Sequence, residues 1–257
     1  MSQNIQNAKA LINTFATGDL DTARHLLAPD YIQHNQAYAT GAAAFISAVE
    51  GLAQASVKTT VQTIRAFEDG DKVFLHTIYN FAGSGEQVAF DIFRFNAEGK
   101  IAEHWDNLDA LAEPNPSGRT QIDGVVETTA TDKEATRTLV TNFVQDVLHG
   151  KNLDKLTSYF DGDNYIQHNA GIADGLSGLG AALVALAEAG LEMVYKETYQ
   201  VLAEDDFALA ISEGEFAGRH VAFYDLFRVE NGYIAEHWVV IQDIVTEAEA
   251  ANDNGKF

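Results

Sequence analysis

The chain repeats itself, and this repeat limits its fold more than any other feature of the sequence. The pentapeptide YIQHN at residues 31–35 recurs unchanged at 165–169, a shift of 134 residues. Two further blocks recur in the same order with shifts of 134 and 133, namely DIFRF (91–95) as DLFRV (225–229) and IAEHW (101–105) as IAEHW (234–238). Solenoid repeats are only roughly 20–50 residues long, so this pattern indicates a duplicated domain rather than a stacked array.

The boundary between the two copies is visible in the composition. Two of the three prolines, Pro114 and Pro116, lie in the polar, glycine-containing stretch LAEPNPSGRTQIDG, which is typical of a linker. The following stretch, TDKEATRTLVTNFVQDVL, has apolar residues at helical spacing and opens the second copy. We therefore expect one domain at residues 1–112, a linker at 113–130 and a second domain at 131–257.

Within each copy, helices come first and strands follow. In the first copy, IQNAKALINTFATG predicts an amphipathic helix ended by Gly18, and DLDTARHLLAPD predicts a second helix ended near Pro29. YIQHN predicts a short bend or strand, and GAAAFISAVEGLAQA a third helix. Four β-rich runs joined by Asp-Gly and Glu-Gly turns then predict an antiparallel meander. The expected fold class is α+β, with two tandem cone-shaped domains in which about three helices pack on a curved antiparallel sheet and enclose a pocket.

Composition excludes several partners and chemistries. The net charge of -22 disfavours nucleic-acid and membrane partners, because an acidic surface repels phosphate backbones and anionic lipid. The absence of cysteine excludes disulfides and thiolate sites. No apolar run approaches the ~18 residues of a membrane helix, and the N-terminal residues lack a secretory pattern, so we expect a cytoplasmic location.

Strand alternation predicts what each face of the sheet carries. His104 and Asp106 share one face of the last strand, and the short preceding turn makes this strand the antiparallel neighbour of the strand with Asp91. Counting from the turn brings Asp91 close to Asp106, on the concave face. The other candidate side chains of this pocket are His34 and Asn35 from YIQHN, and Tyr79, His76 and Phe93 from the strands.

The opposite face carries a different set. Arg94 lies near Glu103, which predicts a cross-strand ion pair that Arg228 and Glu236 repeat in the second copy. Trp105 and its counterpart Trp238 share this convex face. We expect the two tryptophans to pack the sheet of one copy against that of the other.

The concave set supports more than one interpretation. Two carboxylates and an imidazole in an apolar pocket can raise one carboxyl pKa and form a general acid–base site, or they can form a hydrogen-bonded cluster that only stabilises the fold. His34, His104 and Asp106 also have the composition of a two-histidine, one-carboxylate metal site. The second copy keeps His168, Asp225 and His237 but carries Val239 at the position of Asp106, so it lacks the acid–base group.

YIQHN, DIFR, GKIAEHWDNL and the closing ANDNGKF resemble the SnoaL-like polyketide cyclase family of the nuclear transport factor 2-like superfamily. The resemblance covers nearly all of both copies. It implies the α+β cone with a deep pocket, and association through the convex sheets, here as an intramolecular pseudo-dimer with a possible further homodimer. It also implies that Asp106 and His104 perform acid–base catalysis without a metal or organic cofactor, with Asp91 at a polar position beside that aspartate. Within the family, the likeness is to proteins predicted to catalyse aldol condensation.

Two functions follow as expectations. In the first, the N-terminal pocket is a cofactor-independent acid–base enzyme for aldol condensation, cyclisation or isomerisation of a small carbonyl compound. Asp106 removes a proton α to the carbonyl while His104 or His34 binds the enolate oxygen. In the second, both apolar pockets bind a small hydrophobic molecule without changing it. The substrate-binding candidates are Tyr79, His76, Phe93 and Asn35, with His168, His237 and Asp225 in the second copy.

Overall fold

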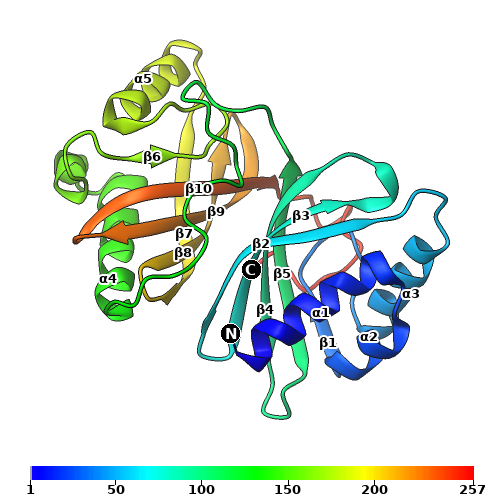
Figure 1. The fold of residues 1–257 in the computed structure, drawn as a ribbon. Coiled ribbons are helices and arrows are strands. Elements are labelled where there is room, and N and C mark those ends of the chain that lie inside the picture. Colours follow the sequence, from blue (N-terminus) through cyan, green and yellow to red (C-terminus); the bar gives the residue numbers. More distant parts are fainter. Residues whose placement is uncertain (1) are drawn as a thin grey trace. The chain divides into compact units, whose positions relative to one another are not determined.

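The computed structural model describes residues 2–257, which form two compact units, each built around a five-stranded sheet (Figure 1). Unit 1 comprises the chain up to Leu111 together with the terminal segment Ile244–Phe257, and unit 2 comprises Ala112–Asp243. The chain passes from unit 1 to unit 2 between Leu111 and Ala112. The segment expected as a linker, 113–130, belongs to unit 2, and the terminal segment expected in the second domain belongs to unit 1.

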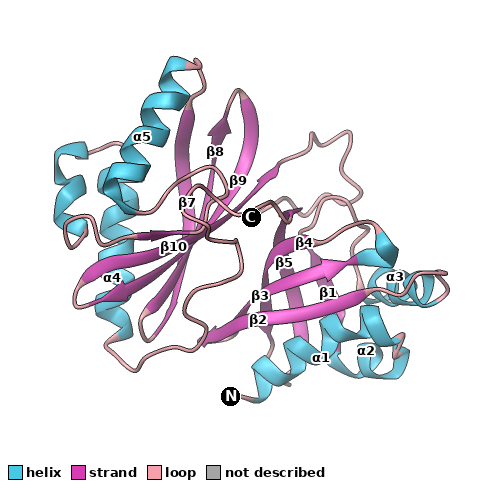
Figure 2. Cartoon of the chain, turned by 45° about the horizontal axis from the view of Figure 1, so that its top comes forward, coloured by secondary structure: helices cyan, strands magenta, loops and turns pink. Residues whose placement is uncertain are grey.

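Three helices cover one face of the unit 1 sheet (Figure 2). Helix α1 (Gln3–Thr17) ends at Gly18, whose φ of 74° lies in the left-handed region that glycine adopts without strain. Helix α2 (Leu20–Leu26) ends before the expected position near Pro29, because the residue before a proline prefers an extended backbone and strand β1 (Leu27–Gln33) has already begun. Helix α3 (Ala42–Ala53) follows β1.

The sheet of unit 1 has the strand order β1-β5-β4-β3-β2, with β2 (Thr60–Asp69), β3 (Lys72–Asn80), β4 (Gln87–Phe95) and β5 (Ile101–Ala110). β2 to β5 form the predicted antiparallel meander, whereas β1 pairs with β5 in parallel. The sheet is therefore mixed, because β1 is joined to the meander through α3 instead of through a hairpin. Asp91 pairs with Asp106 and Arg94 with Glu103, which confirms the predicted register.

The core of unit 1 lies between these helices and the sheet. Ala8, Leu11 and Ile12 recur at helical spacing on α1 and are almost fully buried, as is Val49 on α3. They pack against inward-facing strand residues such as Leu75. Burying one such side chain contributes about 1.5–3 kcal/mol, so this apolar layer fixes the helices over the sheet and thereby the pocket between them.

Unit 2 repeats this topology, with the strand order β6-β10-β9-β8-β7 and β6 parallel to β10. Its helices are α4 (Lys133–Phe143), which continues into a π turn, and α5 (Gly175–Glu188). Its strands are β6 (Ile166–Gln167), β7 (Met193–Glu204), β8 (Phe207–Phe216), β9 (Arg219–Glu230) and β10 (Tyr233–Asp243). Among residues 2–257, no helix is long and apolar enough to cross a membrane.

The segments that follow the last strand of each copy share a turn. NPSGR at 115–119 and NDNGK at 252–256 each place a glycine, Gly118 or Gly255, at a φ of 79°. In unit 2, the Asn115 side-chain amide donates to the backbone carbonyl of Gln167 at 2.7 Å. In unit 1, the Asn254 side-chain amide donates to the backbone carbonyl of the equivalent glutamine, Gln33, at 2.8 Å. Each copy's final segment is thus built into the unit formed by the other copy.

Candidate active site

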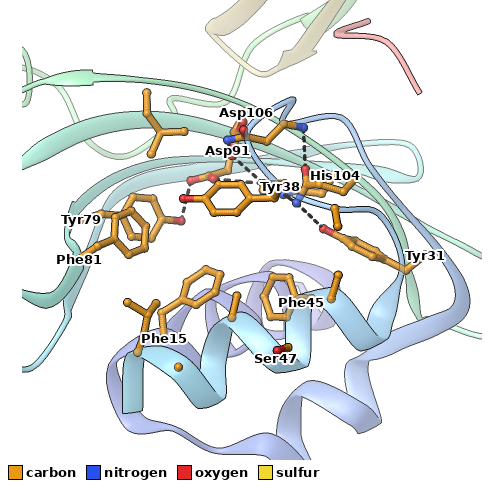
Figure 3. Close-up of a pocket in the computed structure, with 18 residues that line it drawn as sticks. Phe15, Tyr31, Tyr38, Phe45, Ser47, Tyr79, Phe81, Asp91, His104 and Asp106 are labelled. Atoms are coloured by element: carbon orange, nitrogen blue, oxygen red, sulfur yellow. Dashed lines mark hydrogen bonds and ion pairs between the residues drawn. The ribbon is translucent and has the colours of Figure 1, made fainter. Parts of the chain in front are cut away.

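A cavity of about 540 Å³ lies between α3 and the sheet of unit 1 (Figure 3). One wall is apolar, with Phe15 from α1 and Phe45 from α3 pointing into the cavity. The opposite end is polar. The lining residues with polar side chains include Tyr31, Gln33, Asn35, Tyr38, Asp91, His104 and Asp106.

Asp91 is buried at the polar end with both carboxylate oxygens occupied. Its Oδ1 lies 3.2 Å from Nε2 of His104, and its Oδ2 accepts a hydrogen bond from the Tyr79 hydroxyl at 3.0 Å. Burial raises the pKa of Asp91, and the hydrogen bond and charge interaction with His104 offset part of that rise. Asp91 therefore holds two neighbouring side chains, one with each carboxylate oxygen.

His104 is oriented from three sides. Its ring stacks on Phe93 with 4.3 Å between ring centroids and 3° between ring planes. Its Nδ1 lies 3.2 Å from Nε2 of Gln33, and the amide of Gln33 is oriented because its Oε1 accepts from the backbone N–H of Asn35 at 2.8 Å. Nδ1 of His104 is then an acceptor, and the ring proton lies on Nε2, facing Asp91.

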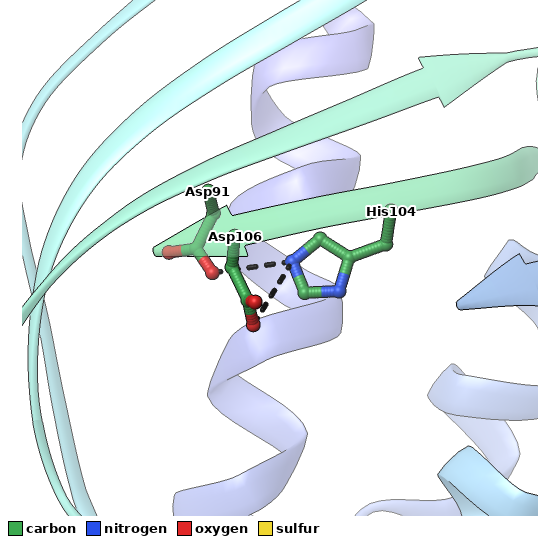
Figure 4. A group of neighbouring side chains, drawn as sticks. All are labelled: Asp91, His104 and Asp106. Atoms are coloured by element: carbon green, nitrogen blue, oxygen red, sulfur yellow. Dashed lines mark hydrogen bonds and ion pairs between the residues drawn. The ribbon is translucent and has the colours of Figure 1, made fainter. Parts of the chain in front are cut away.

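Asp106 differs from Asp91 in one respect that matters for chemistry. Its Oδ2 accepts a hydrogen bond from the Asn35 side-chain amide at 3.0 Å and lies 4.0 Å from Nε2 of His104 (Figure 4). Its Oδ1 is buried and has no hydrogen-bond partner among residues 2–257. Buried polar atoms are nearly always paired, so an unpaired carboxylate oxygen in a cavity marks a position for a ligand or a proton.

Tyrosine hydroxyls provide a neutral hydrogen-bond donor in the same cavity. The Tyr31 hydroxyl oxygen accepts from Nε2 of Gln33 at 3.0 Å, which leaves its own hydrogen for a ligand. Burial, followed by the charges of Asp106 and Asp91, raises the pKa of Tyr31 well above its usual value, so this phenol stays protonated. Tyr38 is about half exposed and lies at the cavity opening.

Alternation along β1 explains which residues of YIQHN line the cavity. Tyr31, Gln33 and Asn35 line it, whereas His34 lies on the opposite face. Sequence reasoning overlooked Tyr31 and Gln33, although the period of two that correctly paired His104 with Asp106 also applies to this strand.

The expectation that His34 enters the pocket is wrong. Its Nε2 lies 2.9 Å from Oε1 of Glu103, its Nδ1 lies 2.9 Å from the backbone carbonyl of Gly255, and its ring stacks on Trp105. Glu103 also accepts from Arg94 at 2.6 Å, as expected for the outer face. His34 therefore takes part in an outer-face network and cannot bind an enolate oxygen in the cavity.

Two other candidates on the strands also lie elsewhere. His76 faces away from the cavity, because it is offset by an odd number of residues from Tyr79 on β3, and its Nδ1 lies 2.6 Å from Nη1 of Arg65. Phe93 lies behind His104 in the apolar core and is not a lining residue. Tyr79 and Asn35 do line the cavity.

The proposed metal-ligand set is not assembled either, since His34 is on the other face from His104 and Asp106. The group of potential ligands that does meet consists of Asp91, His104 and Asp106, whose ligand atoms all lie within 4.8 Å of one another. In this group, Nε2 of His104 carries the proton that it donates to Asp91, so metal binding would require that proton to leave.

Unit 2 keeps the framework of this cluster without its free carboxylate. Nε2 of His237 lies 2.9 Å from Oδ1 of Asp225, whose Oδ2 accepts from the Tyr195 hydroxyl at 3.1 Å. Tyr195 comes from a different strand than its functional counterpart. In unit 1, Tyr79 lies on β3 and pairs with Val61 on β2. In unit 2, the position of Tyr79 is taken by Gly214 on β8, and the tyrosine, Tyr195, lies at the position of Val61 on the neighbouring strand β7.

Larger side chains also occupy the inner face of unit 2. Phe223 is fully buried at the position that corresponds to Ala89 and stacks on Tyr195 with 4.2 Å between centroids. Val239 stands opposite Asp225, where Asp106 stands opposite Asp91 in unit 1. His168 lies on the outer face, with Nε2 2.8 Å from Oε1 of Glu236 and its ring stacked on Trp238, and so it repeats the arrangement of His34.

Part of the first copy matches a known domain family. Residues 8–104 match the model of the SnoaL-like domain family. A search of curated proteins found no match to this sequence. Similar solved structures include TsrD from Streptomyces laurentii, at 20% identity over 42% of this chain and 91% of that chain, with a TM-score of 0.37. They also include IdmH, a candidate polyketide cyclase from Streptomyces antibioticus, at 24% identity over 42% and 93% of the two chains, with a TM-score of 0.36. Residues 8–104 of this chain are therefore similar to the SnoaL-like domain family.

Proposed function

We propose that unit 1 is a cofactor-independent acid–base enzyme that acts on a small, largely apolar carbonyl compound, with Asp106 as the catalytic base. The observation that carries this proposal is the unpaired Oδ1 of Asp106, buried in a cavity whose other polar atoms are largely engaged with one another. A carboxylate oxygen in such a position can accept a proton from a bound ligand without first breaking a protein hydrogen bond.

The reaction follows from the groups at the polar end. Oδ1 of Asp106 takes a proton from the carbon α to the carbonyl, and the C–H electron pair forms the C=C bond of an enolate. The Tyr31 hydroxyl donates a hydrogen bond to the enolate oxygen, in the role that the sequence had suggested for His34 or His104. Return of the proton from Asp106 to another carbon gives isomerisation, and attack of the enolate carbon on a second carbonyl gives aldol addition or cyclisation.

Asp91 and His104 support this base without exchanging protons with the ligand. The hydrogen bond between Nε2 of His104 and Asp91 keeps the imidazole proton directed at Asp91. Asn35 donates to Oδ2 of Asp106, which fixes the orientation of the carboxylate and leaves Oδ1 without a partner. A proton transfer between carbon and oxygen requires a base whose position is fixed before the ligand binds, and these hydrogen bonds fix the Asp106 carboxylate.

The test uses α-proton exchange, because this step is common to aldol, cyclisation and isomerisation chemistry. The protein is incubated in deuterated buffer with a panel of cyclic and aryl ketones, and deuterium incorporation is followed by NMR. Asp106→Asn keeps the shape of the side chain but removes the base, so exchange should fall by about 100-fold or more. Asp225→Asn in unit 2 is the matched control and should leave exchange unchanged. Full exchange in Asp106→Asn would overturn the assignment.

Ligand binding without chemistry is the second candidate, and the apolar wall formed by Phe15 and Phe45 favours it. It predicts that a ketone from the panel binds unit 1 with micromolar affinity by calorimetry while no deuterium is incorporated. Binding at two sites per chain is not expected, because Phe223 and Tyr195 fill the corresponding region of unit 2.

A further inference from the structure

The terminal segment brings a buried lysine to the edge of the unit 1 site. Nζ of Lys256 donates a hydrogen bond to the backbone carbonyl of Asp106 at 2.5 Å, and the lysine side chain is almost fully buried. Buried lysines are rare, because removing an ammonium group from water is costly unless a partner compensates. The lysine therefore needs an explanation beyond packing.

Its position follows from the strand order. β1 runs beside β5 only as far as Gln33, which pairs with His104, and the next residue, His34, donates its N–H to the carbonyl of His104 at 2.9 Å. The next carbonyl of β5 that points to the same edge is that of Asp106, two residues further on. Lys256 thus takes the place that a longer β1 would have filled.

Several hydrogen bonds hold the segment in this place. The Asn252 side-chain amide donates to the backbone carbonyls of Asn35 and Tyr38, at 2.9 and 2.8 Å. The carbonyl of Gly255 lies 2.9 Å from Nδ1 of His34. The segment thus contacts the backbone and the His34 ring at the end of the YIQHN strand before Lys256 reaches β5.

Unit 2 provides an internal comparison. Arg119 occupies the position of Lys256 in the shared turn, but its Nε donates to Oδ2 of Asp174 at 3.1 Å, and its side chain is 42% exposed. The same unit carries Val239 in place of Asp106. The buried ammonium and the carboxylate therefore occur together in unit 1 and are both missing from unit 2.

We propose that Lys256 is a positioning residue of the unit 1 site, whose ammonium group holds β5 at Asp106 and supplies the positive charge that favours the ionised form of the Asp106 side chain. This inference rests on the proposed role of Asp106 as a base. Two adjacent buried carboxylates, Asp91 and Asp106, repel each other, and a buried cation next to the second one offsets that repulsion. The second copy of the chain thereby completes the active site of the first.

The titratable groups around Lys256 come from three elements. Asp106 lies on β5, with Asp91 behind it on β4. His34 lies at the end of β1, against the carbonyl of Gly255. Burial lowers the pKa of Lys256 from 10.5 to about 8, and the charge of Asp106 limits that fall. The lysine is therefore charged at neutral pH.

The first test measures the Asp106 carboxyl itself, by NMR titration of protein with ¹³C-labelled aspartate. In Lys256→Met, which keeps the length and apolar stem of the side chain, the pKa of Asp106 should rise by about one unit or more, because an opposite charge nearby lowers a carboxyl pKa by about 1–3 units. Arg119→Met in unit 2 is the matched control and should not change it. A rise below about 0.3 unit would overturn the proposal, whether or not the protein is an enzyme.

The reciprocal titration does not depend on the folding of Lys256→Met. The two charges interact mutually, so Asp106→Asn should lower the pKa of the Lys256 ammonium by the same amount. No change in the Lys256 titration would contradict the proposal.

Measurements of deuterium exchange distinguish a failure of this proposal from a failure of the proposed function. In Lys256→Met, deuterium exchange should require a higher pH than in wild type, and Lys256→Arg should restore the wild-type pH profile in part. An unchanged profile in Lys256→Met overturns the role of the lysine. Exchange that survives Asp106→Asn instead overturns the role of the aspartate.

Discussion

Asp91 and Asp106 stand directly opposite each other on β4 and β5, and Nε2 of His104 lies 3.2 Å from the first carboxylate and 4.0 Å from the second. The two aspartates are nonetheless unequal. Asp91 accepts from His104 and Tyr79, whereas Asp106 keeps one buried oxygen without a partner. Hydrogen bonding separates one carboxylate that maintains the site from one that can exchange a proton.

The role of Asp91 can be tested through stability. In Asp91→Asn, the NH₂ group of the new amide replaces one carboxylate oxygen. It therefore faces a hydrogen-bond donor, either the Nε2–H of His104 or the Tyr79 hydroxyl. The free energy of unfolding of unit 1 should fall by about 1–3 kcal/mol, the cost of an unsatisfied buried group. Because the chain has two tryptophans, Trp105 in unit 1 and Trp238 in unit 2, fluorotryptophan ¹⁹F NMR during urea unfolding follows each unit separately.

Asp225→Asn is the control for that experiment. Asp225 has the same kinds of partners, His237 and Tyr195, so this variant should destabilise unit 2 to a similar extent and leave the Trp105 signal unchanged. Equal stability of Asp91→Asn and wild type would show that the Asp91 hydrogen bonds do not contribute to folding.

His104 and its counterpart in unit 2, His237, should differ in the role of Nδ1. Nδ1 of His104 lies beside the Gln33 amide nitrogen, so Nδ1 should be an acceptor and the ring proton should lie on Nε2. Nδ1 of His237 lies 3.1 Å from Oε1 of Gln167, so in this ring Nδ1 faces an acceptor and should donate a hydrogen bond. Imidazole ¹⁵N chemical shifts at neutral pH distinguish the two forms, and identical patterns for both rings would contradict this prediction.

The buried lysine predicts how stability depends on pH. The pKa of Lys256 is about 8 in the folded protein and near 10.5 when exposed, so the unfolded chain binds more protons between these values. The free energy of unfolding of unit 1 should therefore rise with pH across this window, by at most about 3 kcal/mol from this group.

Below pH 8, the cost of burying the charge is fully present. The difference in unfolding free energy between Lys256→Met and wild type should be largest at pH 7 and should shrink toward pH 10.5. Comparing the two proteins cancels the titration of groups that they share. A difference that does not change with pH would show that the pKa of Lys256 is the same in the folded and unfolded protein, so that burial does not lower it.

Restoring the missing aspartate to unit 2 should not create a second active site. Val239→Asp places a carboxylate opposite Asp225, but Arg119 does not reach this position and Phe223 fills the inner face. In an Asp106→Asn background it should restore no deuterium exchange. Unit 2 should lose about 2 kcal/mol or more of stability at pH 7, because the new group is buried without a compensating charge.

Lowering the pH should recover part of that loss. Burial and the neighbouring Asp225 raise the folded pKa of the new carboxyl, so the folded state binds its proton first and gains stability as the pH falls. The ¹⁹F signal of Trp238 measures this recovery. Exchange activity in the double variant would show instead that the inner face of unit 2 admits a ligand.

The sequence by itself determined the duplication, the order of helices and strands, and the pairing of Asp91 with Asp106. These features depend on local signals, namely repeated blocks, periodicity and the length of the turn before β5, which set the register between adjacent strands. The loss of the carboxylate at Val239 was visible for the same reason. The alternation along YIQHN was equally local, and applying it would have placed Tyr31 and Gln33 in the cavity and His34 on the outer face.

Only the tertiary structure decided how the site is completed. Lys256 reaches Asp106 across 150 residues of sequence, and Tyr195 replaces Tyr79 from a neighbouring strand. Neither relationship has a local signature, because periodicity assigns a side chain to a face but does not specify which distant segment packs beside it. The terminal segment binds the end of β1 and the adjacent edge of β5 because that edge offers backbone carbonyls that no strand pairs, and such edges exist only once the sheet has formed.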